Sequence, residues 1–268
     1  MPLIAVTYAK GRPGVTTAAL GLAAVAPAQA RAVVVECDPA GGDLMRRHRL
    51  AAKPSIVDLA AAARGASSAD EAFTAGTQLL HVGGVTVPVV VAPAGGAQTR
   101  AALPELTGAG RSTLTAPERW VIADCGRLEV GSPVWPLLRL ADVVLVLVRG
   151  RADELAHVRE HLGALLDAEP GRLLTVLAPG GVYPPAEVAP VLATYVEQEL
   201  ARDSAAVAVT DALPEDQRAA GVLGGELEAG RRWQRLPLLK ALRQVVDDLG
   251  PYLAVASVSD DGSRTETR

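Results

Sequence analysis

Short apolar runs alternate with longer stretches of helical periodicity along most of this 268-residue chain. In the short runs Val, Ile and Leu follow one another with little polar interruption, which is typical of strands covered on both faces of a sheet. The expected strands are Leu3–Thr7, Ala32–Glu36, Val87–Ala92, Trp120–Asp124, Val143–Val148, Leu173–Ala178 and Ala206–Val209. The expected helices are Thr16–Ala26, Ile56–Arg64, Gln98–Leu106, Pro133–Leu140, Glu154–Asp167, Pro185–Leu200 and Leu236–Leu249.

This alternation predicts a three-layer α/β fold, in which helices cover both faces of a mostly parallel central sheet. We expect one domain over residues 1–253, followed by a flexible polar tail over residues 254–268. In a sheet of this kind, ligands bind beyond the carboxyl ends of the strands. The segments that follow the expected strands are therefore the expected places for a ligand site.

The composition favours a globular protein with an aliphatic core. Hydrophobic residues make up 49% of the chain and aromatic residues only 3%, which excludes disorder and collagen as descriptions of the whole sequence. No apolar stretch reaches the roughly 18–20 residues of a membrane span, and the first residues read as a strand rather than a signal peptide. Cys37 and Cys125 lie in apolar runs, which suits a reducing compartment. We expect a cytoplasmic protein, with peripheral association at the membrane or nucleoid as the alternative.

A glycine-containing segment, Lys10–Thr17, follows the first expected strand and reads KGRPGVTT. Glycines at a turn from strand to helix let backbone N–H groups converge on a phosphate, and the helix N-terminus adds partial positive charge. A complete phosphate loop reads GxxxxGK[ST]. Gly14 and Thr16 occupy the last glycine and the hydroxyl position, but Val15 stands where that pattern has lysine.

This segment resembles the deviant phosphate loop of the ParA/MinD family of P-loop ATPases (the SIMIBI class), which normally reads KGGxGKTT. Ala32–Pro39 is similar to the second strand of that family and its Asp-Pro turn, and Glu118–Gly126 is similar to its Walker B strand. Leu213–Asp216 resembles the late segment near the nucleotide base. The resemblance spans about residues 3–250, and the Gly-Val-Thr-Thr loop is also similar to degenerate ParA/MinD-like proteins of actinobacteria.

The resemblance implies a role for each matching residue. Lys10 matches the signature lysine, which reaches the partner's nucleotide in dimeric relatives, and Asp38 matches the switch residue that positions the attacking water; these two are the expected catalytic residues. Thr16 and Asp124 match the Mg²⁺ ligands. The residues expected to bind ATP or ADP are Gly11, Arg12, Gly14, Val15, Thr16, Thr17 and Pro214.

The absent lysine argues against efficient chemistry. A lysine about 4 Å from a phosphate contributes roughly 4 kcal/mol of Coulomb attraction at an effective dielectric constant of 20, before desolvation. Val15 cannot replace that charge, and Pro13 removes one backbone donor. Arg12 lies in the loop, but its planar head would need a different approach to the phosphate. We expect weak or absent nucleotide binding and impaired or absent ATP hydrolysis.

The expected function is therefore that of a scaffold or positioning protein derived from a nucleotide switch. The resemblance implies a homodimer whose protein partner belongs to a partitioning, septum-placement, pilus-assembly or secretion apparatus. The first alternative is a slow ATPase that dimerises around ATP and Mg²⁺, with Lys10 and Arg12 supplying the missing charge. A redox enzyme with a dinucleotide-type fold is the second alternative, which Gly11–Gly14 does not favour because it is not GxGxxG.

Other polar features have structural interpretations alongside functional ones. Arg46–Arg49 is typical of a solvated face, with contact to an acidic partner as the alternative. Arg231–Arg235 leads into a helix with apolar positions at helical spacing, which we expect to pack on the sheet; nonspecific DNA or membrane contact is less favoured. Glu36, at the end of a strand, is either structural or functional. His157, four residues before His161, is expected on an exposed helix face.

Overall fold

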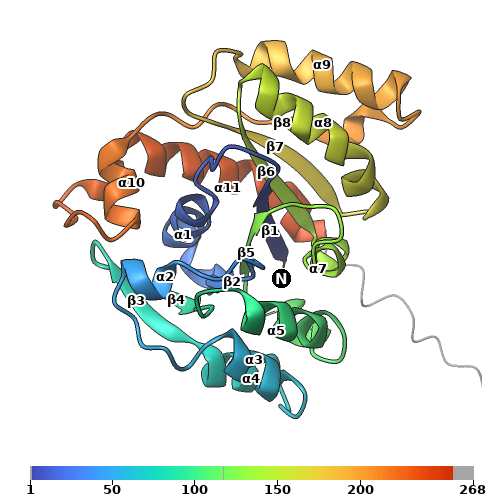
Figure 1. Cartoon of the computed structure of the whole chain (residues 1–268). Helices are drawn as coiled ribbons and strands as arrows, with labels where there is room; N and C mark the ends of the chain where they lie inside the picture. The colour runs from blue at the N-terminus through green and yellow to red at the C-terminus, as the bar shows by residue number, and fades with distance from the viewer. Residues whose placement is uncertain (1, 117, 256–268) are drawn as a thin grey trace, which may run out of the picture.

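The computed structural model describes residues 2–116 and 118–255. It has three layers, with a central sheet between two sets of helices (Figure 1). Within the described residues, eight strands form the sheet in the order β3-β4-β2-β5-β1-β6-β7-β8. Strands β3 and β4 are antiparallel, and every other neighbouring pair is parallel. The predicted three-layer α/β fold is confirmed.

The strands are β1 (Leu3–Tyr8), β2 (Val33–Glu36), β3 (Gln78–Val82), β4 (Val85–Val90), β5 (Val121–Arg127), β6 (Val143–Arg149), β7 (Arg172–Ala178) and β8 (Val207–Val209). The helices are α1 (Val15–Val25), α2 (Leu44–Arg47), α3 (Ile56–Ala63), α4 (Ala69–Gly76), α5 (Ala97–Thr107), α6 (Arg111–Leu114), α7 (Trp135–Leu140), α8 (Ala152–Asp167), α9 (Pro185–Gln198), α10 (Gln217–Leu223) and α11 (Pro237–Val255). Single 3₁₀ turns lie at Ala28–Ala30, Ser204–Ala206 and Trp233–Arg235.

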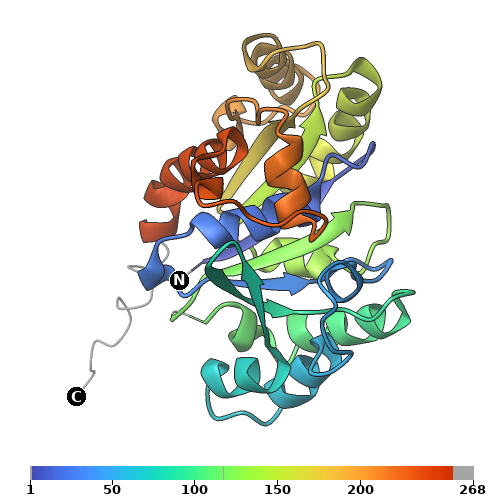
Figure 2. The same ribbon diagram turned by 90° about the vertical axis from the view of Figure 1, so that its left-hand side faces the viewer.

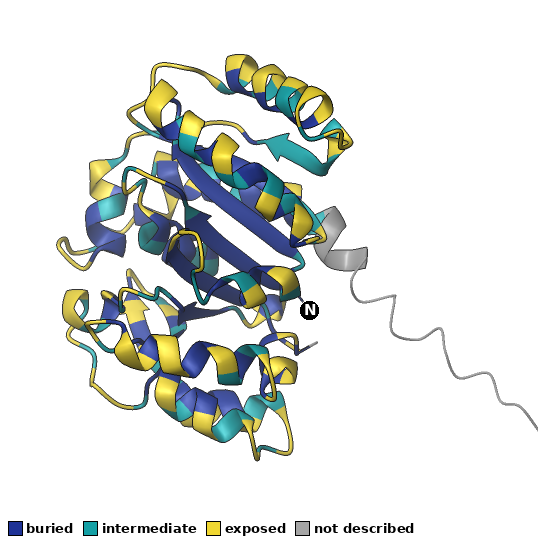
Figure 3. Cartoon of the chain, turned by 45° about the vertical axis from the view of Figure 1, so that its right-hand side comes forward, coloured by how far each residue is buried: buried dark blue, intermediate teal, exposed yellow. Residues whose placement is uncertain are grey.

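Both faces of the central strands are buried, as the uninterrupted apolar runs predicted. In β1, Leu3 and Ala5 contribute to one core cluster, and Ile4 and Val6 contribute to the other. Helices α1, α10 and α11 cover the face that carries Ile4 and Val6, whereas α3 to α9 cover the face that carries Leu3 and Ala5. Figure 3 shows this division, with buried strands between helices whose outer faces are exposed.

The central strands bring three loops to one edge of the sheet. Asp124 of β5 lies beside Val6 of β1 in the parallel register, and Glu36 of β2 lies beside Asp124 on its other side. The chain segments that leave β1, β2 and β5 therefore emerge side by side, as Figure 2 shows. This edge is where the sequence predicted the ligand site.

The sequence predicted each long helix and all strands except β3. Strand β3 forms a hairpin with β4 through Gly83 and Gly84, whose φ values are +57° and +80°. The short helices α2, α4, α6 and α10 were also missed. Helix α11 continues to Val255, two residues beyond the expected end of the domain, and residues 256–268 of the expected tail lie outside the described part of the chain.

The expected packing of the last helix is confirmed, because α11 contributes Leu239, Leu242 and Leu249 to the core. It lies against α1, where a Cβ at Gly21 would overlap the side chain of Leu242. Across residues 2–116 and 118–255, the structure contains no helix that is long and apolar enough to cross a membrane.

We expect Gly21→Ala to lower the free energy of unfolding by about 1–3 kcal/mol, because the added methyl group overpacks a closed helix contact. Alanine is otherwise the better helix former by about 1 kcal/mol. Gly163→Ala in α8 is the matched control, since its Cβ would meet the nearest side chain at an ordinary 3.5 Å. Urea denaturation of both variants tests the contact, and equal stabilisation by both substitutions would contradict it.

Candidate functional site

The loop between β1 and α1 has the backbone shape of a phosphate cradle. Gly11 and Gly14 have φ values of +95° and +93°, a region that favours glycine. Gly14 is the N-cap of α1, and its carbonyl accepts the helix bond from the N–H of Ala18 at 2.9 Å. The first N–H groups of a helix have no acceptor within it, so those of α1 point toward the loop and are available to an anion.

A cavity of about 490 Å³ opens between this loop and the segment that follows β2. Most of the predicted nucleotide and metal residues lie in its walls. Its lining residues are Tyr8, Arg12, Gly14, Val15, Thr16, Thr17, Glu36, Asp38, Ala40, Gly41, Gly42, Asp43, Arg47, Asp124 and Gly126. We call this space the nucleotide cavity.

Thr16 and Asp124 form the predicted metal pair. Their side chains hydrogen-bond to each other, and the N–H of Gly126 donates to Asp124 Oδ1 at 3.2 Å. The pKa of Asp124 is raised to about 6, mainly by burial and also by the nearby charge of Asp38, whereas these hydrogen bonds lower it. Among the described residues, no three His, Cys, Asp or Glu side chains could hold a metal ion by themselves. Mg²⁺ at this pair would therefore complete its coordination with phosphate oxygens and water.

Asp38 faces the nucleotide cavity from the turn after β2. Its Oδ1 accepts the N–H of Ala40 at 2.8 Å, and its carboxylate lies where a Cβ on Gly126 would be. Burial raises the pKa of Asp38, and the nearby charge of Asp43 raises it further. The carboxylate is thus held at the mouth of the cavity, near the metal pair.

Glu36 holds the turn after β2 against the sheet. Its Oε1 accepts the N–H groups of Asp43 and Leu44 at 2.7 and 2.8 Å, and its Oε2 accepts that of Ala92 at 2.9 Å. The side chain is 1% exposed. The pKa of Glu36 is raised to about 7, because the effect of burial exceeds that of these backbone donors, which lower it. Of the two roles left open for Glu36, the contacts support the structural one.

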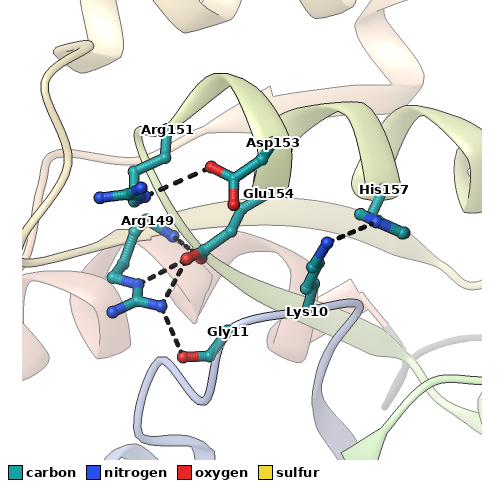
Figure 4. Close-up of polar contacts among 7 residues, drawn as sticks. All are labelled: Lys10, Gly11, Arg149, Arg151, Asp153, Glu154 and His157. Carbon is teal, nitrogen blue, oxygen red and sulfur yellow. Dashed lines mark hydrogen bonds and ion pairs between the residues drawn. The ribbon is translucent and has the colours of Figure 1, made fainter.

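Lys10 points away from the nucleotide cavity. Its Nζ lies 3.1 Å from Nε2 of His157 on α8 (Figure 4). Lys10 and Gly11 line a neighbouring hollow of about 640 Å³, which shares Arg12 and Asp38 with the nucleotide cavity. His157 is half-buried, so the exposed helix face that was predicted for it is found only in part.

The start of α8 supports the phosphate loop through an ion pair that the sequence did not reveal. Arg149 donates from Nη2 to the carbonyl oxygen of Gly11 at 2.7 Å and from Nε to Glu154 Oε1 at 2.7 Å (Figure 4). Glu154 is 1% exposed and fills the place that a Cβ on Gly11 would take. An acidic residue in the first turn of a helix is ordinary, so Glu154 gave no sign of this role.

Of the predicted site residues, Pro214 lies in the walls of neither cavity. It follows Leu213, whose N–H donates to the carbonyl oxygen of Leu177 at 2.7 Å, and so lies beyond the end of β7. Asp216 caps α10 by accepting the N–H of Ala219. The late segment is therefore well ordered by its own hydrogen bonds, and its expected contact with a nucleotide base stays a prediction.

No protein-family model and no curated protein matches the sequence. Solved structures do match the fold. A ParA family ATPase from Chlorobium tepidum TLS gives a TM-score of 0.65 at 14% sequence identity, over 91% of this chain and 96% of that chain. The septum site-determining protein MinD from Pyrococcus horikoshii OT3, complexed with Mg-ADP, gives 0.62 at 14% identity, over 94% and 98%. The chain has the ParA/MinD fold.

A third structure with the ParA/MinD fold is pNOB8 ParA bound to nonspecific DNA, with a TM-score of 0.56 at 12% identity, over 92% of this chain and 99% of that chain. The match covers nearly the full length of each of these proteins. The ParA/MinD fold was expected from the motifs at Lys10–Thr17 and Glu118–Gly126, so the structural comparison and the sequence motifs agree on it.

We expect the stability of Glu36→Gln relative to the wild type to depend on pH. Because the folded protein raises the pKa of Glu36 from 4.5 to about 7, the unfolded chain releases the proton first as the pH rises. The wild-type free energy of unfolding minus that of the variant should thus fall by about 2–3 kcal/mol between pH 4.5 and 7.5.

Urea denaturation at several pH values measures this difference. The variant should also be less stable than the wild type at pH 4.5, because its amide NH₂ group faces a backbone N–H donor. Glu187→Gln on the exposed surface of α9 is the control, with a difference near zero at every pH. A pH-independent difference for Glu36→Gln would show that burial does not disfavour its charged form.

Proposed function

We propose that this chain is a ParA/MinD-like positioning or scaffold protein, derived from a nucleotide switch, which binds ATP or ADP with Mg²⁺ weakly and hydrolyses ATP slowly or not at all. The observation that carries the proposal is a phosphate loop with its cradle shape and its Thr16–Asp124 pair, but with Val15 in place of lysine. The Val15 side chain is 5% exposed and belongs to the core, so it offers nothing to a phosphate.

The charges around the nucleotide cavity support weak binding. Its walls contain four carboxylates, from Glu36, Asp38, Asp43 and Asp124. Two arginines oppose them, and Arg47 is already paired with Asp43 at 2.6 Å. A phosphate without a cation would be repelled here, whereas Mg²⁺ supplies the charge that lets carboxylates and phosphates share one site. Nucleotide binding should therefore depend strongly on Mg²⁺.

The position of Lys10 supports slow or absent hydrolysis. Phosphoryl transfer requires positive charge where negative charge develops on the γ-phosphate. Asp38 lines the cavity and would orient a water there, but Lys10 contacts His157 outside it. In a homodimer Lys10 would have to leave His157 before it could reach the nucleotide of the partner subunit.

The finer biological role follows from the ParA/MinD resemblance. We infer a cytoplasmic homodimer that binds a protein of a partitioning, septum-placement, pilus-assembly or secretion apparatus. Peripheral contact with the membrane or with DNA in the nucleoid is less favoured, since the chain carries a net charge of −4. We also propose that the phosphate loop is of the degenerate type found in ParA/MinD-like proteins of actinobacteria.

One observation favours the alternative of a slow ATPase. Arg12 has an exposed side chain, lines both the nucleotide cavity and the neighbouring hollow, and has a φ value of +56°. A guanidinium at this point of the loop could approach a phosphate from the open side. ATP turnover well above that of a Thr16→Ala variant would establish this alternative.

We expect Val15→Lys to tighten Mg-ADP binding at least about tenfold, because it restores a cation worth a few kcal/mol next to the phosphates. Isothermal titration calorimetry of wild type and variant measures the change. Val15→Met, which adds similar length without charge, is the matched control and should leave the affinity within about threefold. Equal affinity for the lysine and methionine variants would show that the cradle no longer accepts phosphate.

We expect the Mg²⁺-dependent part of ADP affinity to fall about fourfold between pH 7.5 and 5.5, because Asp124 with a pKa near 6 takes up its proton over that range. Titrations with and without Mg²⁺ at both pH values separate this effect from protonation elsewhere. The Asp124→Asn variant should bind ADP weakly at both pH values. A wild-type Mg²⁺ effect that is the same at pH 5.5 would remove Asp124 from the metal site.

A further inference from the structure

A basic groove crosses the surface formed by α2, the β3–β4 turn and the segment between α10 and α11. It consists of two adjoining hollows of about 750 and 500 Å³, whose walls share Gly83 and Ala229. All three of its elements lie on the same side of the molecule, at the left of Figure 1. The arginines in its walls are Arg46, Arg47, Arg49, Arg231, Arg232 and Arg235.

Most of this positive charge has no partner. Arg47 forms an ion pair with Asp43, but the side chains of the other five arginines form no ion pair or hydrogen bond with any residue that the structure describes. Within that part of the chain, Glu228 is the one acidic residue in the walls. In a protein with a net charge of −4, such a concentration of unpaired arginines is a local feature and not a reflection of the average surface.

The walls of the basic groove are fixed to one another. Trp233 donates from Nε1 to the carbonyl oxygen of Gly83 at 2.6 Å, which ties the segment before α11 to the β3–β4 turn. His48 Nε2 lies 3.1 Å from the carbonyl oxygen of Leu223, which ties α2 to the end of α10. A groove held in this way is formed before a ligand arrives, so binding costs little ordering of the walls.

We propose that the basic groove binds an acidic segment of a partner protein. The arginines would pair with Asp and Glu side chains of the segment, since guanidinium groups match carboxylates in a forked geometry. Between the arginines the wall also contains apolar side chains, including Val222 and Leu227, and Leu227 is 53% exposed. This mixture fits a peptide that carries an apolar side chain among acidic ones.

The mixture of arginines and apolar side chains in the walls favours a peptide over a nucleic acid as the ligand. Single strands bind proteins by stacking bases on exposed aromatic rings, but Trp233, the one Trp, Tyr or Phe among the described wall residues, is only 4% exposed. A phosphate backbone would satisfy the arginines and leave Leu227 without an apolar partner. The overall negative charge of the chain also opposes a long polyanion more than a short one.

The groove adjoins the nucleotide cavity through α2. Arg47 lines both, and the residue with which it pairs, Asp43, donates its N–H to Glu36 at the end of β2. A bound segment would therefore contact α2, which also borders the nucleotide cavity. Binding itself needs no nucleotide, so the proposal stands or falls independently of the proposed nucleotide site.

The test uses the full chain without nucleotide and a fluorescein-labelled peptide of about 12 residues, in which Glu and Asp alternate with Leu. We expect saturable binding by fluorescence anisotropy that weakens at least about tenfold when the salt concentration rises from about 50 to 500 mM. Arg46→Glu combined with Arg232→Glu, one change in each hollow, should weaken binding at least tenfold. Arg111→Glu combined with Arg139→Glu alters the net charge equally, lies on α6 and α7, and should change the affinity less than threefold.

Three controls make the outcome decisive. Circular dichroism checks that both double variants are folded, and Arg49→Glu with Arg235→Glu provides a second pair in the groove with the same expected loss. A peptide with Gln and Asn in place of Glu and Asp should not bind. The proposal is overturned if the wild type does not bind the acidic peptide, if both kinds of double variant lose affinity equally, or if a DNA duplex or a phosphatidylserine vesicle binds the groove more tightly at the same salt.

Discussion

The position of Asp124 between two parallel neighbours is the constraint on which the candidate site depends. In the register of the sheet Asp124 lies beside Val6 and Glu36, so the chain segments that leave β1 and β2 must emerge next to it. Helix α1 then begins close enough for Thr16 to hydrogen-bond to Asp124. Because side chains alternate along a strand, a slip of one residue in β5 would turn this carboxylate into the opposite core and abolish the site.

The fold was predictable where burial on both faces removes polar residues from a strand. Strand β3 escaped prediction because it lies at the edge of the sheet, where only Leu80 and Val82 are buried and the run QLLHV keeps polar positions. The Gly83-Gly84 pair was an available signal for the hairpin. Helix α2 is only four residues long and its first N–H is held by Glu36, so its formation depends on tertiary contacts that no local pattern records.

The motif residues of the candidate site were predictable from the sequence, but the residues that hold the phosphate loop from outside it were not. Thr16 belongs to the phosphate-loop motif and Asp124 to the motif at the end of β5. Both could be placed by analogy with ParA/MinD motifs. The contacts of Arg149 with Gly11 and of His157 with Lys10 join residues 138 and 147 positions apart. The first contact depends on β6 lying beside β1 in the sheet, and the second depends on how α8 packs next to the phosphate loop. Neither arrangement is determined by the local periodicity of the sequence.

Contacts to Gly11 explain the shape of the phosphate loop. Gly11 is held by the side chains of Arg149 and Glu154, so the cradle depends on contacts within the protein and not on a cation at position 15. Compared with the lysine of the GxxxxGK[ST] pattern, Val15 lacks charge, in a cavity whose walls carry four carboxylates and two arginines. Arg46, Arg47 and Arg49, on and after α2, line the basic groove. We infer that the two surfaces select opposite ligands: the cavity requires a cation before it accepts a phosphate, whereas the groove attracts carboxylates directly.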